Sequence, residues 1–248
     1  MYSTIINGQA TTLGTSGMLY RSNKVMYDRL TFSLWSQLLG IPVVGPLAGS
    51  GIKLRLFPVS LTTWVEWVVE HPDTTVLSLD TGVYPASSYE PESSPASLYW
   101  DYREDPETRF PVWNRDDRLE TKDEVLGLTI DEADKAYPIE VIQEERLIND
   151  VVGGSEVVIV ASSNSSAARV YVRSGQEFSL PDSEAPVGLP VSLIDSTGVE
   201  WRVTENALVS SADPSETLER VYSQVSFWFG WFAFHPETLL YDGETAGP

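Results

Sequence analysis

The chain has 248 residues, of which 42% are hydrophobic and 11% aromatic. It can therefore bury a sizeable core in one large domain or two small ones, and it is not a disordered polymer. The absence of cysteine excludes disulfides, thiolate metal sites and a cysteine nucleophile. The longest mostly apolar stretch, from Val225 to Phe234, is far shorter than the ~20 residues that cross a bilayer.

The charge is strongly negative, with 36 Asp and Glu against 16 Lys and Arg and a net charge of −20. This field repels polyanions, so we expect no nucleic-acid partner. Lysine is scarce and the acidic residues are spread along the chain, which is typical of a protein that works in concentrated salt. We therefore expect a halophilic protein, with an ordinary acidic protein as the alternative. The N-terminus lacks the basic and apolar regions of a signal peptide, so the chain as given is expected to be soluble and cytoplasmic.

The first element in chain order is a helix from Trp64 to His71. Thr62 or Thr63 can cap its N-terminus, with Glu66 at or next to the reciprocal capping position, and Pro72 ends it. Residues 82–120 follow as a long connection with five prolines, serines and acidic residues. We expect an irregular loop that aromatic side chains anchor to the surface. These anchors are Tyr99, Trp100, Tyr102, Phe110 and Trp113.

The C-terminal half is rich in predicted strands, because short β-branched runs are bounded there by Gly, Asp, Ser or Pro. These runs span residues 125–130, 157–161, 168–173 and 191–195. The Gly153-Gly154 pair predicts a tight turn between two strands. A second short helix is expected at Trp228 to His235. The fold class is therefore α+β, mainly β.

An internal repeat links the two predicted helices. The segment Trp64-Val-Glu-Trp67-Val-Val-Glu-His71-Pro72-Asp-Thr74 reappears as Trp228-Phe-Gly-Trp231-Phe-Ala-Phe-His235-Pro236-Glu-Thr238. Upstream, Thr31 and Trp35 match Thr197 and Trp201 at nearly the same offset. We predict two pseudo-repeated strand-rich units, each with one Trp/His-Pro helix.

The predicted division is a first unit at residues 1–81, a Pro-rich and acidic connection at 82–120, and a second unit at 121–248. The second unit begins with a segment, residues 125–170, that has no counterpart in the first. By the offset, that counterpart would precede Met1. The first unit is therefore expected to lack its N-terminal part.

Several longer phrases fall in an order that resembles one family. They are Gly17-Met-Leu-Tyr-Arg-Ser-Asn-Lys-Val-Met-Tyr-Asp-Arg29, Ser33-Leu-Trp-Ser-Gln37, Gly45-Pro-Leu-Ala-Gly49, Lys135-Ala-Tyr-Pro138, Asn149-Asp-Val-Val-Gly-Gly154 and the two Trp/His-Pro segments. From about residue 5 to 241 the chain resembles the domain of unknown function 3179 family, as an N-terminally truncated member. The resemblance implies a two-fold repeat and no established activity.

Members of that family typically have a Cys-Pro-x-Cys phrase in the first repeat, just before the segment that corresponds to Met1 here. The equivalent place in the second unit is Ser162-Ser-Asn-Ser165, without cysteine. No role of that thiol pair can therefore be transferred to this chain.

Three pairs of polar residues are candidate binding residues. His71 and His235 are either two halves of one site or structural residues at helix ends. Asp28 and Arg29 are either ligand contacts or a turn with a surface ion pair. Asn149 and Asp150 are either ligand contacts or turn residues.

Other residue types are less promising as sites. Lys135 lies among acidic residues and is either a base or anion contact, or part of a charge-balanced turn. The serines at 162–166 lack the Gly-x-Ser-x-Gly context of a hydrolase. We find no metal-ligand or phosphate-binding motif, so we expect no cofactor.

Two functions from different classes remain open. The favoured one is a non-catalytic binding or structural module, in which a groove lined by Trp and Tyr accepts an unknown small or polymeric ligand. The alternative is an enzyme at the junction of the two repeats, with His71 or His235 as acid/base and Asp28 or Asp150 as partner.

Overall fold

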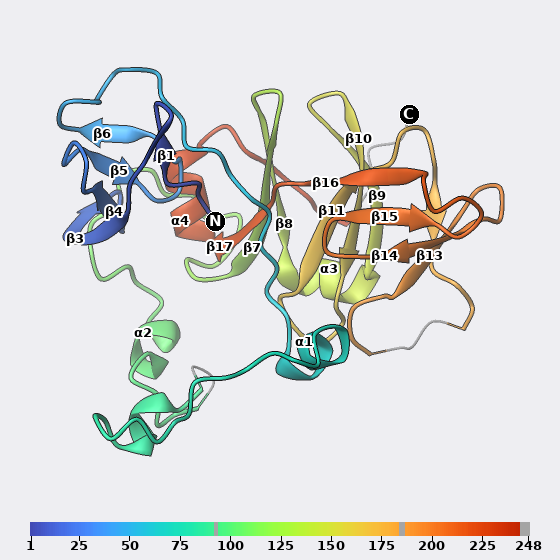
Figure 1. Cartoon of the computed structure of the whole chain (residues 1–248), viewed down its shortest axis with the longest axis horizontal. Coiled ribbons are helices and arrows are strands. Elements are labelled where there is room, and N and C mark those ends of the chain that lie inside the picture. Colours follow the sequence, from blue (N-terminus) through green and yellow to red (C-terminus); the bar gives the residue numbers. More distant parts are fainter. Residues whose placement is uncertain (92–93, 184–186, 244–248) are drawn as a thin grey trace.

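The computed structural model describes residues 1–91, 94–183 and 187–243. It is mainly β, with three larger sheets, one β-ribbon and a few short helices, so the predicted α+β, mainly β class is confirmed. In Figure 1 a small N-terminal sheet, a central sheet and a barrel-like sheet follow one another across the molecule. No helix within the described residues is long and apolar enough to cross a membrane.

The N-terminal sheet is antiparallel, in the order β3-β4-β5-β6. Its strands are β3 (Leu13–Tyr20), β4 (Asn23–Asp28), β5 (Leu34–Ser36) and β6 (Pro42–Val44), preceded by the ribbon β1 (Ile5–Ile6) and β2 (Gln9–Ala10). Trp35 is fully buried at its centre, together with Ile6 and Leu54.

The largest sheet has eight strands in the order β12-β13-β14-β15-β16-β11-β10-β9. Its strands are β9 (Leu147–Val152), β10 (Ser155–Ala161), β11 (Ala168–Val172), β12 (Phe178–Ser179), β13 (Ser192–Asp195), β14 (Glu200–Val203), β15 (Ala207–Ser210) and β16 (Thr217–Val221). The Asn149 side chain donates to the Phe178 carbonyl and accepts from the Phe178 N–H, at 2.8 and 3.0 Å. These two bonds join the edge strands, so the sheet nearly closes into a barrel.

The strands β10 and β11 have apolar residues on both faces because both faces are covered. Val158 and Tyr171 point into the barrel core with Trp201. Val157 and Ile159 point outward, into a second core beneath α3 (Ile139–Glu145). Double burial explains the uninterrupted Val-Val-Ile-Val run.

The central sheet has the order β17-β7-β8-β18. Its strands are β7 (Glu124–Ile130), β8 (Ala133–Pro138), β17 (Gln224–Phe227) and β18 (Leu239–Leu240), with α4 (Trp228–Phe234) between the last two. In α4, Trp228 and Trp231 are buried against Val125 and Ala136 of the β7–β8 hairpin. The α4 residues Ala233 and Phe234 share a core with Leu38 and Val112.

The predicted helices and strands lie where the sequence places them. Helix α1 (Trp64–Glu70) has a full capping box between Thr63 and Glu66. Strands β7 and β10 cover the predicted runs 125–130 and 157–161, and β11 and β13 match the runs 168–173 and 191–195 to within one residue. Gly153 and Gly154 form the turn between β9 and β10 with positive φ values of 59° and 81°, as a two-residue hairpin turn requires.

The connection 82–120 is largely irregular, with the 3-10 helix η1 (Ala86–Tyr89) and helix α2 (Trp100–Glu104). The prediction that aromatic side chains anchor this connection is wrong for three of them, because Tyr99, Phe110 and Trp113 are 60%, 50% and 89% exposed. Trp100 and Tyr102 are half-buried. The aliphatic Val112 is buried instead, in the core that α4 shares with Leu38.

Candidate ligand-binding site

A cleft of about 840 Å³ lies between α2, the β7–β8 hairpin and α3. Two aromatic side chains, Trp100 and Phe227, contribute to its wall. The remaining lining residues are Arg103, Glu104, Leu119, Lys122, Asp123, Glu124, Pro138, Ile139, Glu140, Val141, Gln143 and Ser166. Neither histidine of the chain is among them. We call this cavity the Glu124 cleft.

The carboxylate of Glu124 is held from two sides. Arg103 Nη2 donates to its Oε1 at 2.6 Å, and Ser166 Oγ donates to its Oε2 at 2.5 Å. The Arg103 guanidinium also lies 5.4 Å from the centre of the Phe227 ring. Arg103 lies on α2, Glu124 begins β7 and Ser166 lies two residues before β11. Because these three segments meet here, the Glu124 carboxylate is pre-oriented in the cleft.

The cleft has a negative balance. Four carboxylates line it, from Glu104, Asp123, Glu124 and Glu140, against the two cationic groups of Arg103 and Lys122. Lys122 is already engaged, because its Nζ donates to the backbone carbonyls of Tyr102 and Asp105. Glu124 and Asp123 already accept hydrogen bonds, but each carboxylate oxygen can accept a second one. The lining residues that the structure describes therefore offer mainly acceptors.

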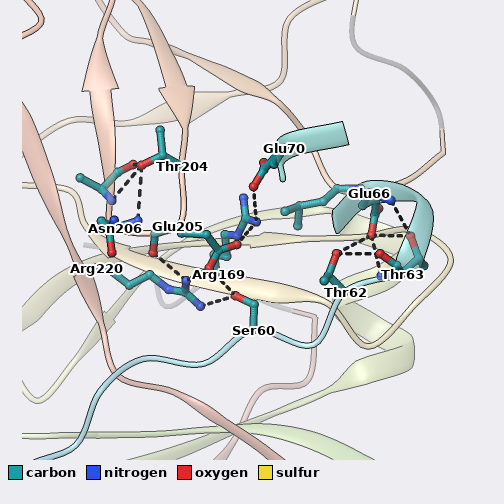
Figure 2. Close-up of polar contacts among 12 residues, drawn as sticks. Ser60, Thr62, Thr63, Glu66, Glu70, Arg169, Thr204, Glu205, Asn206 and Arg220 are labelled. Atoms are coloured by element: carbon teal, nitrogen blue, oxygen red, sulfur yellow. Dashed lines mark hydrogen bonds and ion pairs between the residues drawn. The ribbon is translucent and has the colours of Figure 1, made fainter. Parts of the chain in front are cut away.

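A second polar cluster joins α1 to the barrel (Figure 2). Arg169 on β11 and Arg220 on β16 both bind the carboxylate of Glu205, and Arg220 also donates to Ser60 Oγ at 2.7 Å. Burial raises the pKa of Glu205, but the charges of Arg169 and Arg220 outweigh burial and hold this pKa below its ordinary value. Arg169 Nη2 also lies 3.8 Å from Glu70 at the end of α1.

Glu66 fastens α1 a second time. Its carboxylate accepts from the hydroxyls of Thr62 and Thr63 and from the Leu189 N–H at 3.1 Å. Burial raises the pKa of Glu66, but these hydrogen bonds and that from the Thr63 N–H lower it below its ordinary value. The first turn of α1 is thus tied to the barrel wall, beside a groove of about 260 Å³.

A comparison with protein-family profiles matches residues 1–238 to the family described as Protein of unknown function (DUF3179). The chain belongs to this family. No curated protein and no solved structure matches the chain. The family assignment predicted from the sequence is confirmed.

The six residues predicted as binding residues do not form one site in this DUF3179 chain. Helices α1 and α4, which end before His71 and His235, lie in separate parts of the molecule (Figure 1). His71 is exposed, whereas the His235 side chain is 12% exposed and its Nδ1 lies 2.9 Å from Asp134 Oδ2. Burial lowers the pKa of His235, although Asp134 acts in the opposite direction.

Asp28 and Arg29 stabilise the N-terminal sheet of this DUF3179 chain. Asp28 is fully buried and accepts from the Thr31 N–H and from Trp35 Nε1, at 2.5 and 2.9 Å. Arg29 is exposed and donates to Thr12 Oγ1 at 3.0 Å. The predicted turn is present, because the Asp28 carboxylate organises the chain after β4. The expected surface ion pair is wrong for Asp28, since this carboxylate is buried and bonds Thr31 and Trp35.

Asn149 and Asp150 lie within β9, so their interpretation as turn residues is wrong. Asn149 closes the barrel, while Asp150 accepts from Lys135 Nζ at 2.6 Å and from the Tyr137 hydroxyl at 2.7 Å. Lys135 is therefore buried and not part of an exposed charge-balanced turn. Burial and the Asp150 carboxylate both raise the pKa of the Tyr137 hydroxyl.

The two Trp/His-Pro segments of this DUF3179 chain make the same local contacts. Trp67 Nε1 donates to Thr74 Oγ1 at 3.0 Å, and Trp231 Nε1 donates to Thr238 Oγ1 at 2.9 Å. The rings of Trp67 and His71 have their centres 4.1 Å apart, and those of Trp231 and His235 are 3.9 Å apart. The His71 N–H donates to the Trp67 carbonyl, and the His235 N–H donates to the Trp231 carbonyl.

A second set of matching contacts surrounds Trp35 and Trp201. Asp195 accepts from the Thr197 N–H, the Thr197 hydroxyl and Trp201 Nε1. Asp28 makes the corresponding contacts with Thr31 and Trp35. The sequence indicated the Thr and Trp of each set but not the aspartate that joins them.

Proposed function

We propose that this chain is a non-catalytic ligand-binding module made of two copies of one strand-rich unit, and that its ligand occupies the Glu124 cleft. The matching hydrogen bonds of the two Trp/His-Pro segments, and of Asp28 and Asp195, support the two copies. The observation on which the binding role rests is the pre-oriented Glu124 carboxylate beside the aromatic groups of Trp100 and Phe227. A few fixed polar groups beside apolar rings are typical of binding pockets.

The proposed ligand is rich in hydrogen-bond donors, such as hydroxyl or ammonium groups. Four carboxylates and Gln143 can accept such donors, while the rings of Trp100 and Phe227 offer apolar surface. An anionic ligand would meet like charges, since Lys122 already binds two backbone carbonyls. The ligand is therefore neutral or cationic.

The first prediction concerns Glu124. Glu124→Gln removes the charge and one acceptor, so we expect the affinity for the bound ligand to fall at least about tenfold, which is ~1.4 kcal/mol. Isothermal titration calorimetry with neutral oligosaccharides, with polyamines and with dicarboxylates measures this change. Binding of oligosaccharides would indicate that the cleft recognises hydroxyl groups, and binding of polyamines would indicate that it recognises ammonium groups.

Glu107→Gln is the matched control, because this carboxylate is 72% exposed and pairs with Arg115 outside the cleft. We expect it to leave the affinity unchanged. Preferential binding of dicarboxylates, or equal binding by Glu124→Gln and the parent chain, would contradict the proposal.

One observation favours the alternative of an enzyme. His235 Nδ1 lies 2.9 Å from Asp134 Oδ2, and its Nε2 is buried without a hydrogen-bond partner among the residues that the structure describes. A carboxylate behind an imidazole orients the ring for proton transfer. In this alternative the partner of the histidine is Asp134, not Asp28 or Asp150.

The second prediction separates these roles for His235. Because its pKa is lowered from 6.5 in the folded chain, the unfolded chain takes up the proton first as the pH falls. The contribution of His235 to stability is therefore complete above pH 6.5 and is lost below it. We expect His235→Gln to lower the free energy of unfolding by about 1 kcal/mol at neutral pH. The variant should also lose less stability than the parent chain as the pH falls below 6.5, as measured by urea unfolding. Loss of an activity with unchanged stability would support the enzyme.

We also propose that the acidic, lysine-poor surface adapts the chain to concentrated salt. At −20 the folded chain repels itself, and at about 1 M salt the screening length is only ~3 Å. We therefore predict that the thermal unfolding temperature rises by several degrees between dilute buffer and molar KCl. Differential scanning calorimetry measures this change, and a salt-independent unfolding temperature would contradict the adaptation.

A further inference from the structure

Helix α1 and the chain on both sides of it expose apolar side chains. Leu61, Trp64, Val76 and Leu77 are 54%, 51%, 65% and 82% exposed. Residues 57–63 and 74–78 belong to no strand. We call the surface formed by residues 60–64, Trp67 and 75–77 the α1 face.

The matching residues around α4 are covered. Trp228 and Trp231 are each 1% exposed, and Tyr241, the counterpart of Leu77, is 2% exposed. Their cover is the β7–β8 hairpin, which pairs with β17 before α4 and with β18 after it. Gly127 of β7 lies directly under the Trp231 ring, so near that a Cβ there would be 2.2 Å from Trp231 Cζ3.

On another side, each helix contacts residues of the other unit. Helix α4 shares a core with Leu38 of the N-terminal unit and accepts at the Ala233 carbonyl from Arg21 Nη1 at 2.6 Å. Helix α1 is tied to the barrel through Glu66 and Leu189, as Figure 2 shows for Glu66. The two helices are thus equivalent on this side. Within residues 1–91, 94–183 and 187–243 they differ in the hairpin, which covers α4 and has no counterpart over α1.

The surroundings of the two histidines also differ in whether a carboxylate is present. The β8 residue Asp134 pairs with His235. His71 is exposed, and its ring contact within the described residues is with Trp67. A cover for the α1 face that resembles β7–β8 would bring a carboxylate to His71.

We propose that the α1 face binds a β-hairpin of a partner polypeptide. The hairpin adds two antiparallel strands between residues 60–63 and 75–77, which then pair as β17 and β18 do. It has a glycine under the Trp67 ring and an acidic residue beside His71. Backbone pairing supplies affinity in such strand addition, and the alternate side chains supply specificity. This proposal rests on the two-copy organisation proposed above and not on the Glu124 cleft.

A backbone-cyclised peptide of residues 124–138 is the probe for this surface. Added to the full chain, it should bind saturably at one site per chain, with slower amide exchange at residues 60–63 and 75–77. The same peptide with Gly127→Val should bind at least about tenfold more weakly, because its side chain would meet the Trp67 ring. This comparison leaves the folding of the chain untouched.

Variants of the chain locate the binding surface. Trp67→Ala should abolish peptide binding, whereas Trp113→Ala, which alters an aromatic side chain that is 89% exposed elsewhere, should leave it unchanged. Absence of saturable binding, or equal binding of the Gly127→Val peptide, would overturn the proposal. If the chain dimerises without peptide and amide exchange at residues 75–77 is slowed in the dimer, the α1 face binds a second copy. This result would also overturn the proposal. Ligand binding in the Glu124 cleft is measured separately, so failure of one proposal is distinguishable from failure of the other.

Discussion

Asp150→Ala should reduce the free energy of unfolding by about 3–5 kcal/mol, the typical cost of removing one partner of a buried ion pair. The Asp150 side chain is fully buried and that of Lys135 is 10% exposed. The substitution leaves the Lys135 ammonium and the Tyr137 hydroxyl without their shared acceptor. The Val151 N–H, which donates to Asp150 Oδ1 at 2.7 Å, also loses its partner. Urea unfolding followed by tryptophan fluorescence measures the loss.

Two further variants test this explanation of the Asp150 effect. The double variant Lys135→Met with Asp150→Leu removes both charges, so it should recover most of the stability. Glu107→Gln removes an exposed carboxylate partner of Arg115 and should change stability by less than about 1 kcal/mol. Equal destabilisation by the single and double variants would show that packing, not the unpaired ammonium, determines the cost.

The sequence predicted elements whose signals are local. The capping box of Thr63 and Glu66 defines the start of α1 because both of its hydrogen bonds lie within four residues. The β-branched runs at β7 and β10 predict strands because such side chains fit a pleated, covered surface. Helix α3 was missed, since seven residues after Pro138 are too short for a clear periodic pattern.

Contacts between distant segments were not accessible from sequence patterns. Arg103, Glu124 and Ser166 meet only because α2, the start of β7 and the segment before β11 converge. Their spacing of 21 and 42 residues gives no periodic signal. Asn149 and Asp150 have the local preference of turn residues. Their partners, Phe178 and Lys135, instead hold them in β9, so tertiary contacts override that preference.

Gly127→Ala should be the other strongly destabilising change, at about 3 kcal/mol, because the added methyl group has no space. Its Cβ would lie 2.2 Å from Trp231 Cζ3, far inside van der Waals contact. The Trp231 ring cannot move aside, since it is buried with Val125, Ala136 and Trp228. The overlap therefore has to be relieved by separating α4 from β7. Thermal and urea unfolding measure the cost.

Gly230→Ala in α4 is the matched control for this change. Among the described residues, a Cβ at Gly230 meets no atom within 4 Å apart from its chain neighbours and the backbone of its own helix. Alanine favours a helix over glycine by up to about 1 kcal/mol. We therefore expect this variant to be as stable as the parent chain or more so. The double variant Gly127→Ala with Trp231→Leu should lose less than the sum of the two single losses, because the smaller side chain vacates the space that the methyl group needs. Additive losses would mean that Gly127 is required for the backbone conformation of β7 and not for the close contact with Trp231.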